Sequence, residues 1–408
     1  MSYAGQNGCM SNVLFVLYHD FTSNSAIHVY HWANELTALG ASCLVAVPEN
    51  VKSLSVLGSA SFGARTFEDL ENGAIFPNGR GPDIVHAWTP RENVRQLCQR
   101  LRERHSFRQF IHLEDNEQYL VAKMSNRPWK TIAGMDEQEL DALIPDHLTH
   151  PVRGEKFLKD AQGVTVIIDR LREFVPKNVS AMELWPSADP KLFFKRPVNQ
   201  DLRAKLGIAP KTTVIAYTGN VHAANANEVR SVYLAVAILN REGYPAALVR
   251  AGQDFHPFLG PDERWGREHS FELGFVPHRE IADVLAAADI LVQPGKPGEF
   301  NDYRFPSKLP EFVAIGRPVI LPASNIALHM KHGEDAYVLP KVDALAIVDA
   351  AVKITTDREL YDRLALGARD FFERRLSWDK SARQLLAFYD GEAVAASVNG
   401  LSNLNRNV

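Results

Sequence analysis

Short apolar runs alternate with longer helical patterns through most of this chain, and that rhythm limits the folds it can adopt. Near the start, residues 12–18 form an apolar run, and residues 26–39 have the spacing of an amphipathic helix. Gly40 then provides a helix stop, and residues 42–47 form the next apolar run. Strand, helix and strand in this order make a βαβ unit, so the sequence predicts an α/β fold with parallel sheets.

The apolar runs fall into two series. The first series continues with predicted strands at residues 83–88, 110–114 and 163–168. Between residues 186 and 210 the rhythm lapses into Pro, Asp and Lys, and a second series starts at Thr213. The second series predicts strands at residues 213–218, 246–251, 270–275, 290–293 and 318–321, and helices at residues 228–242, 279–288, 307–315 and 344–355. We therefore expect two doubly wound, Rossmann-like domains.

The lapse in rhythm also sets the expected domain limits. They are an N-terminal domain at residues 1–190, a C-terminal domain at residues 191–375, a last helix at residues 376–391 and a flexible tail at residues 392–408. Two such domains in series leave a cleft between them, and open α/β sheets bind ligands beyond the carboxyl ends of their strands. Functional residues are therefore expected in the loops that follow the strands.

Composition excludes several classes of protein. The 408 residues are 46% hydrophobic and carry a net charge of −4, which fits a globular protein and not a general nucleic-acid binder. The three cysteines, Cys9, Cys43 and Cys98, have neither metal-ligand nor disulfide-framework spacing, so we expect a reducing compartment, the cytoplasm. Because no apolar run is long enough to span a bilayer and the start lacks the pattern of a signal peptide, any membrane contact is expected to be peripheral.

Residues 290–320 form the most informative stretch, which reads as strand, loop, helix and strand. Pro306 fits the first turn of the helix, where the free N–H groups that follow make an anion site. Lys308 and Glu311 lie three apart and share a helix face, as a cation for phosphate and a carboxylate for ribose hydroxyls would. A plain surface ion pair is the alternative. Arg304 adds a second cation to the same loop, and together these residues favour a nucleotide site.

This stretch resembles an element of the retaining, GT-B-fold glycosyltransferases of family 4. Residues 303–311, followed by residues 312–320, look like that family's E-x7-E motif with the helix and strand after it. The resemblance implies that Glu311 binds the donor ribose, and that the backbone of Phe305, Pro306 and Ser307 contacts the diphosphate and sugar. Tyr303 stands where the family has its first Glu, which binds the transferred sugar. Either Glu299 or Asp302 replaces that Glu, or the sugar is held in a different way.

Two further segments are similar to the same family. Residues 214–220 resemble the strand and glycine that open its C-terminal domain, which implies a ligand approach at Gly219 and Asn220. The Arg and Lys that usually follow that glycine are absent, so Arg250, with Lys308 and Arg304, is the expected source of charge for the diphosphate. Residues 273–276 resemble the loop that faces the nucleobase, which assigns the backbone of Phe275 and Val276 to that role.

The first half offers candidates on the acceptor side. Ser23, Asn24 and Ser25 precede the first helix and are good N-cap residues, with Asn24 the candidate for a ligand contact. His86 and Glu114 are placed at the ends of two predicted strands, where an open sheet puts its site. Helix capping and solvated loop charge are the alternative explanations for these residues.

No metal or other cofactor is expected. The sequence has no D-x-D between a strand and a loop and no His or Cys ligand spacing, so cations, helix N-termini and loop N–H groups would stabilise the leaving group. The resemblance implies transfer with retention of the anomeric configuration, in which the departing phosphate oxygen takes the acceptor proton and no side-chain nucleophile is needed. It also implies that the helix at residues 376–391 crosses back onto the N-terminal domain.

The resulting hypothesis is a glycosyltransferase that moves a sugar from a nucleoside-diphosphate donor to a carbohydrate, lipid-linked or small-molecule acceptor, by analogy in surface-polysaccharide assembly. Two alternatives stay open. One is a catalytically silent homologue that binds a sugar or a partner. Tyr303 and the missing basic pair favour this alternative. The other is a nucleotide-sugar epimerase or a phosphorylase with the same architecture.

Overall fold

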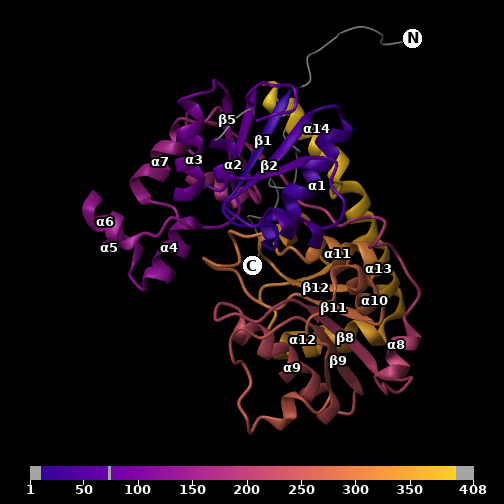
Figure 1. The fold of residues 1–408 in the computed structure, drawn as a ribbon. Helices are drawn as coiled ribbons and strands as arrows, with labels where there is room; N and C mark the ends of the chain where they lie inside the picture. Colours follow the sequence, from indigo (N-terminus) through magenta and orange to yellow (C-terminus); the bar gives the residue numbers. More distant parts are fainter. Residues whose placement is uncertain (1–10, 72–74, 392–408) are drawn as a thin grey trace, which may run out of the picture. The chain divides into compact units, whose positions relative to one another are not determined.

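The computed structural model describes residues 11–71 and 75–391 (Figure 1). The chain forms two compact units. The first runs to Trp185 and resumes at Trp378, and the second is Pro186–Ser377. The limits expected from the sequence are residues 190 and 375, and the predicted tail at residues 392–408 lies outside the described residues.

A seven-stranded parallel sheet forms the centre of the first unit, with the order β3-β2-β1-β4-β5-β6-β7. The strands are β1 (Asn12–Leu17), β2 (Ser42–Val47), β3 (Gly63–Thr66), β4 (Ile84–Trp88), β5 (Arg108–Leu113), β6 (Gly163–Val166) and β7 (Ser180–Glu183). β1 is buried along its whole length, as expected for a central strand of a sheet covered on both faces.

Helices surround this sheet. They are α1 (Asn24–Ala38), α2 (Phe67–Glu71), α3 (Glu92–Arg102), α4 (Glu117–Ser125), α5 (Trp129–Ile132), α6 (Glu137–Leu143), α7 (Pro151–Lys159) and α14 (Trp378–Tyr389). Alternate residues of β1 join the core made with α1 and α14, and Trp32 Nε1 donates to Ser381 Oγ at 2.8 Å. The last helix, drawn in yellow beside α1 in Figure 1, is therefore part of the first unit.

Helices α4, α5 and α6 have a small core of their own. Val121, Ile132 and Leu140 are buried against one another in a cluster separate from the main core of the unit. These helices fall between β5 and β6, where the sequence pattern indicates only charged helical or loop stretches. Their helical turns are too short for a 3.6-residue period to be read from the sequence.

A six-stranded parallel sheet forms the centre of the second unit, with the order β10-β9-β8-β11-β12-β13. The strands are β8 (Thr213–Thr218), β9 (Ala246–Ala251), β10 (Ser270–Glu272), β11 (Ile290–Val292), β12 (Val319–Pro322) and β13 (Tyr337–Leu339). The helices are α8 (Gln200–Lys205), α9 (Ala226–Arg241), α10 (His278–Ala286), α11 (Leu309–Ile315), α12 (Ala344–Thr356) and α13 (Arg358–Arg375).

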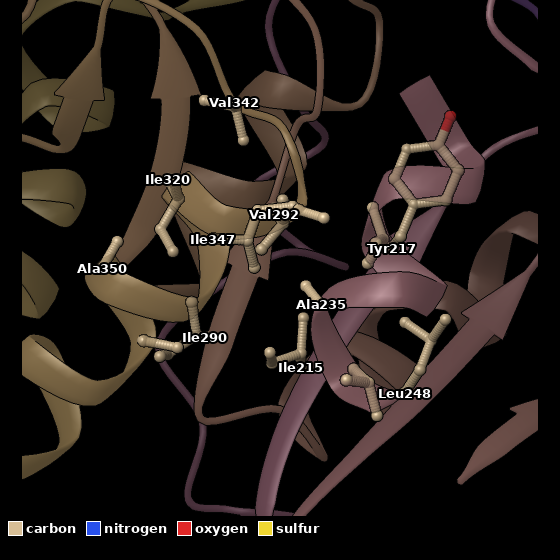
Figure 2. Close-up of a cluster of buried hydrophobic side chains, with 14 of the residues drawn as sticks. Ile215, Tyr217, Ala235, Leu248, Ile290, Val292, Ile320, Val342, Ile347 and Ala350 are labelled. Carbon is tan, nitrogen blue, oxygen red and sulfur yellow. The ribbon is translucent and has the colours of Figure 1, made fainter. Parts of the chain in front are cut away.

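The two faces of this sheet have different cores. Ile215 and Tyr217 of β8 pack with α9 and α12 in the cluster of Figure 2, whereas Val214 belongs to a cluster on the other face with Val249 and Val284. This alternation follows from the two-residue period of a strand. Two doubly wound parallel sheets are therefore present, and the predicted fold class is confirmed.

The strands that the sequence pattern misses all lie at sheet edges. They are β3 and β7 in the first sheet and β13 in the second. β3 contains a glycine, and none of its residues is fully buried, so it has no continuous apolar run to detect. The edge strand β10 is also shorter than expected, because it ends at Glu272 instead of residue 275.

Candidate functional site

Each sheet has one point at which the order of its strands reverses. β1 lies between β2 and β4, and β8 lies between β9 and β11. At such a point, the connections that follow two neighbouring strands lead to opposite edges of the sheet. Ligands of doubly wound folds bind outside the carboxyl ends of these two strands. The loops after β8 and β11, and those after β1 and β4, are therefore the places where a ligand is expected.

Two glycines bring the loops after β8 and β9 into close contact in the second unit. Gly219 and Gly252 have φ values of 140° and 141°, which L side chains rarely adopt. A Cβ on Gly252 would lie 2.1 Å from the carbonyl oxygen of Gly219. Asn220 Oδ1 accepts from the backbone N–H of Gln253 at 2.8 Å. The close approach at Gly219 is thus one between two backbone turns, and the Asn220 oxygen fixes the loop itself, while the expected approach of a ligand stays a prediction.

Lys308 reaches the same turn from the loop after β11. Its Nζ donates to the hydroxyl of Tyr217 at 3.1 Å and lies 4.3 Å from the centre of that ring. A Cβ on Gly219 would be only 2.7 Å from this ammonium group. A half-buried positive charge therefore rests against the Gly219–Asn220 backbone at the reversal point of the sheet, which is favourable for an anion.

The helix after this loop begins later than expected. α11 starts at Leu309, with Lys308 as the N-cap residue and Pro310 in the first turn. The prediction that Pro306 occupies the first turn is therefore wrong, because Pro310 provides the proline that a first turn tolerates. Lys308 and Glu311 are nevertheless both near the N-terminus of α11, as the sequence indicates.

Arg304 belongs to a polar cluster that fixes the loop after β11. Its Nη2 donates to Asn301 Oδ1 at 2.9 Å, and the guanidinium group stacks on Phe300 at 3.9 Å. Asn301 in turn donates to Glu228 Oε1 at 2.7 Å. Burial raises the pKa of Glu228, although the hydrogen bond from Asn301 and the charges of Arg304 and Lys308 oppose this. Sequence reasoning missed Glu228, which lies in the first turn of α9 and gives no signal of contact with a loop 73 residues away.

The two carboxylates expected to replace the missing first Glu have different positions. Glu299 is exposed, whereas Asp302 Oδ2 accepts from the backbone N–H of Gly298 at 3.0 Å within its own turn. Tyr303 is buried, with 9% of its surface exposed. Of the three predicted backbone ligands, Ser307 is exposed, and Phe305 and Pro306 are buried.

Glu311 has a partner that sequence reasoning did not find. His278, the first residue of α10, lies with its Nε2 2.7 Å from Glu311 Oε1. The hydrogen bond to Glu311 raises the pKa of His278, and burial only partly opposes it. Phe275, three residues before, is 73% exposed, and Val276 is half-buried. These two residues thus lie on the loop that leads into α10.

Arg250 does not have the environment of a solvated strand-end charge. It is 2% exposed in β9, and its Nη2 donates to Asp254 Oδ1 at 2.5 Å. Burial alone would lower its pKa, but the hydrogen bond from Arg250 to Asp254 and the neighbouring Tyr233 raise the value. In this arrangement Asp254 and the core hold the guanidinium group of Arg250, whereas Lys308 and Arg304 lie in the loop after β11.

In the first unit, the loop after β1 leads into α1. Ser23 is the N-cap residue, since its side chain accepts from the backbone N–H of Ala26, and Asn24 is exposed at the first helical position. Ser25 is buried, and its hydroxyl donates to Glu114 Oε2. Asn24 is therefore accessible at this turn, and the cap role belongs to Ser23.

Glu114 follows β5 and is buried among hydrogen-bond donors. His28 Nδ1 lies 3.1 Å from its Oε1, in addition to the contact with Ser25. Burial alone would raise the pKa of Glu114, but the hydrogen bond and charge of His28, with smaller contributions from His112 and Ser25, lower it to about 2. The carboxylate is therefore ionised at neutral pH and stabilises the loop between β5 and α4.

This shift predicts a pH-dependent contribution to stability. Because the folded pKa of Glu114 lies below the unfolded value, the contribution is complete above about pH 5 and is lost as the pH falls toward 2. We expect Glu114→Gln to be less stable than wild type by about 3 kcal/mol at pH 7. Urea unfolding, followed by tryptophan fluorescence, measures this difference in the first unit, because Trp265 is the one tryptophan in the second. A difference that is unchanged at pH 3 would contradict the assignment.

His86 lies inside the core and not at the end of its strand. β4 continues to Trp88, and His86 is fully buried. Its Nδ1 is 2.7 Å from the Tyr389 hydroxyl, and its Nε2 is 3.0 Å from Thr165 Oγ1. Burial lowers its pKa well below the usual value, so the ring is neutral. The expected strand-end position is wrong, and both ring nitrogens already have partners from α14 and β6.

Sequence reasoning missed a buried ion pair that lies beyond the carboxyl ends of β4 and β5. Arg91 follows β4, and its guanidinium group stacks on the ring of Tyr18 at 3.7 Å. Its Nη2 lies 3.4 Å from Glu117 Oε1, and Thr149 donates to Glu117 Oε2 at 2.7 Å. The position of Arg91, three residues beyond a strand, is the signal that could have identified it.

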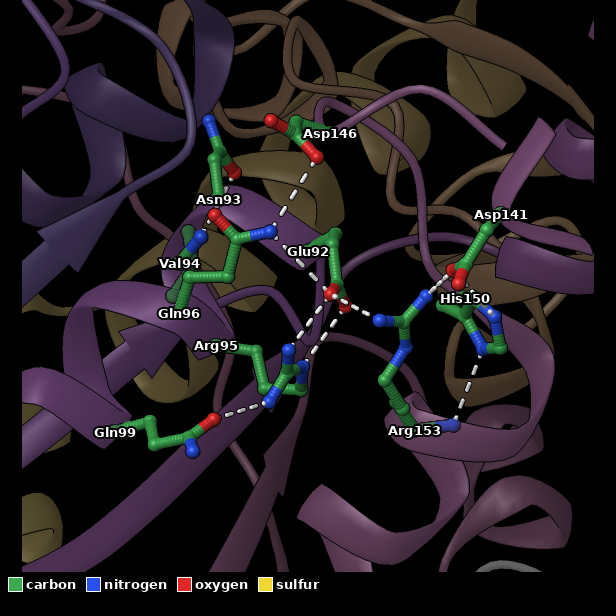
Figure 3. Close-up of polar contacts among 10 residues, drawn as sticks. All are labelled: Glu92, Asn93, Val94, Arg95, Gln96, Gln99, Asp141, Asp146, His150 and Arg153. Carbon is green, nitrogen blue, oxygen red and sulfur yellow. Dashed lines mark hydrogen bonds and ion pairs between the residues drawn. The ribbon is translucent and has the colours of Figure 1, made fainter. Parts of the chain in front are cut away.

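Farther along the first unit, an ion-pair network joins three helices. Glu92 of α3 binds Arg95 at 2.6 Å and lies 3.5 Å from Arg153 of α7 (Figure 3). Arg153 also pairs with Asp141 of α6, and His150 caps α7 by accepting from the Arg153 backbone N–H. All these charges are paired, so the network is best explained as the support of α6 and α7.

Within residues 11–71 and 75–391, no three His, Cys, Asp or Glu side chains are grouped as a metal site would require. In the same residues, none of the helices combines the length and hydrophobicity that crossing a bilayer requires.

The comparisons with known proteins concern the second unit most directly. Residues 212–357 match a family model described as Glycosyl transferases group 1. These residues contain Gly219, Asn220, Lys308 and Glu311. A search of curated proteins finds no match to this sequence.

Solved structures with the same fold cover nearly the whole chain. Anabaena HepE, in a complex with UDP and glucose, has a TM-score of 0.67 at 12% identity, and the match covers 93% of this chain and 99% of HepE. Sucrose-phosphate synthase from Thermosynechococcus elongatus has a TM-score of 0.64 at 16% identity, with 93% and 98% covered. WaaG, a glycosyltransferase involved in lipopolysaccharide biosynthesis, has a TM-score of 0.61 at 14% identity, with 93% and 100% covered.

The family match and the similar solved structures agree with each other. The solved structures share two parallel-sheet domains with this chain, and the family model falls on the unit that contains Lys308 and Glu311. The chain thus has the GT-B fold, and its residues 212–357 match the glycosyl transferases group 1.

Proposed function

We propose that the protein is a glycosyltransferase that transfers a sugar from a nucleoside-diphosphate donor to a carbohydrate, lipid-linked or small-molecule acceptor. The observation that carries this proposal is the position of Lys308, whose ammonium group rests against the Gly219–Asn220 turn at the reversal point of the second sheet. A diphosphate there would receive a charge-assisted hydrogen bond from Lys308. Arg304, in the same loop, adds positive charge.

The other donor contacts follow from this position. Glu311, near the N-terminus of α11, is 15% exposed at its side chain and is assigned to the ribose hydroxyls. The loop with the exposed Phe275 is assigned to the nucleobase. HepE is described with UDP and glucose and with UDP-glucose, so UDP-glucose is the first donor to test.

The first unit is assigned to the acceptor. Asn24 is accessible at the start of α1, and the ionised Glu114 lies behind this turn through its bond with Ser25. In the proposed reaction the bond between the anomeric carbon and the phosphate oxygen breaks, the anomeric carbon bonds to the acceptor oxygen on the same face, and the phosphate oxygen takes the acceptor proton. Cations of the protein stabilise the leaving group, and no metal is required. The cytoplasm, or the inner face of a membrane for a lipid-linked acceptor, is the proposed location.

A calorimetric and thermal-shift screen of UDP, GDP, ADP and their common sugars, without added metal, tests the donor assignment. At 100 times Kd a bound ligand should stabilise the protein by roughly 2.7 kcal/mol. We expect one diphosphate to bind wild type, and Glu311→Ala and Lys308→Ala each to weaken that binding. If none of them binds wild type, the transferase proposal fails.

The buried Tyr303 favours a second candidate, a catalytically silent homologue. The family's sugar-binding Glu is absent at this position, Asp302 is committed to its own turn, and Glu299 is exposed. Binding of a nucleotide-sugar without release of the diphosphate, in the presence of an acceptor mixture, would support this candidate over the transferase.

A further inference from the structure

The contact between α10 and α11 has a feature that the family resemblance does not explain. His278 Nε2 and Glu311 Oε1 are 2.7 Å apart, and the ring of Phe193 packs against the His278 ring. His278 is half-exposed at its side chain, whereas Glu311 is 15% exposed. The pair therefore lies at the surface of the second unit, with the carboxylate on the more protected side.

The imidazole of His278 is held from two sides. Phe193, which is fully buried, packs against it with ring centroids 5.3 Å apart. Glu311 Oε1 accepts a hydrogen bond from the Nε2 of this imidazole. The negative charge of Asp189, in the segment before Phe193, also acts on the imidazole. Both negative charges raise the pKa of His278 and favour the imidazolium form. Arg279 and Glu280, the next residues of α10, pair with each other at 3.5 Å.

Within residues 11–71 and 75–391, the contact of Glu311 with His278 uses one of its two carboxylate oxygens. Oε1 accepts from His278, so the carboxylate cannot rotate freely about its last bond, and Oε2 points in a fixed direction. A carboxylate oriented in this way is suited to accept from a hydroxyl group of a ligand. The gain comes from preorganisation, because the side chain loses less freedom when the ligand binds.

We propose that His278 is a positioning residue that orients Glu311 toward the ribose hydroxyls, so that the protein selects ribonucleoside over 2′-deoxyribonucleoside diphosphates. This inference rests on the proposed donor site of the second unit. It assigns a role to His278 that neither the motif nor the spacing of residues 303–311 indicates.

The test compares UDP, ADP and GDP with their 2′-deoxy forms by calorimetry on the full-length protein. For the base that binds, wild type is expected to prefer the ribonucleotide by on the order of 10-fold, the value of one hydrogen bond to a charged group. His278→Ala should reduce this preference to less than about 3-fold, mainly by weakening the binding of the ribonucleotide. His278→Gln, whose amide can donate to Glu311 from a similar position, should restore most of it.

The variants separate this role from a structural one. Arg279→Ala, one residue farther along the exposed start of α10, is the matched control and should keep the wild-type preference. If His278→Ala weakens the binding of both nucleotides equally and His278→Gln does not restore the preference for the ribonucleotide, His278 only supports the fold and the inference is overturned. If wild type binds a diphosphate without preferring ribose, the positioning role fails while the donor site stands. If wild type binds none of the six nucleotides, the donor proposal itself fails.

Discussion

Gly252→Ala is expected to destabilise the second unit by roughly 3–5 kcal/mol and to abolish nucleotide binding. The backbone of Gly252 has a φ of 141°, and the added Cβ would lie 2.1 Å from the carbonyl oxygen of Gly219. Since the three atoms nearest to the new methyl group all belong to the backbone of Gly219 and Asn220, no side chain can rotate away. The turn at Gly219 and Asn220 would have to move, and that turn is the one against which Lys308 rests.

Differential scanning calorimetry measures the stability, and titration with the best-binding diphosphate measures the affinity. Gly260→Ala is the matched control in the same unit, because its Cβ would have only ordinary contacts, the nearest at 3.5 Å to Glu263. Wild-type stability in Gly252→Ala would show that the two turns are not packed as described.

Lys308→Met is expected to weaken diphosphate binding by roughly 10- to 100-fold while leaving the fold intact. Methionine keeps an unbranched chain of similar length against the Tyr217 ring but removes the charge that a phosphate would contact. Lys296→Met is the control, because Lys296 is an exposed lysine in the same loop.

Calorimetric titration of both variants distinguishes a local contact from a general effect of positive charge. The salt dependence of binding should also be weaker in Lys308→Met than in wild type, because one ion contact is lost. Equal losses in the two variants would argue that the loop attracts anions without a specific bond from Lys308.

The central strands were predictable from the sequence because they have strong local signals. β8 and β9 match their expected bounds, since buried parallel strands are continuous apolar runs. Gly219 was singled out as a glycine after a strand, and Lys308 as a cation that shares a helix face with Glu311. The structure brings them together, with a virtual Cβ on Gly219 only 2.7 Å from Lys308 Nζ.

Other features depend on contacts between residues that are distant in sequence. His278 and Glu311 are 33 residues apart, and Glu228 and Asn301 are 73 apart, so no periodicity connects them. Arg250 was expected to supply charge to the diphosphate from the end of its strand, whereas the structure buries it beside Tyr217 and Glu272 in the sheet register and pairs it with Asp254. His86 gave the same error, because its partners Thr165 and Tyr389 come from β6 and α14.

The most direct test of the account is a crystal structure of the protein with the nucleoside diphosphate that gives the largest thermal shift. We expect the diphosphate between Lys308 and the Gly219–Asn220 backbone, with the ribose hydroxyls at Glu311 and the base at the loop of Phe275. A nucleotide bound elsewhere, or one that leaves Lys308 on Tyr217 without a phosphate contact, would contradict it.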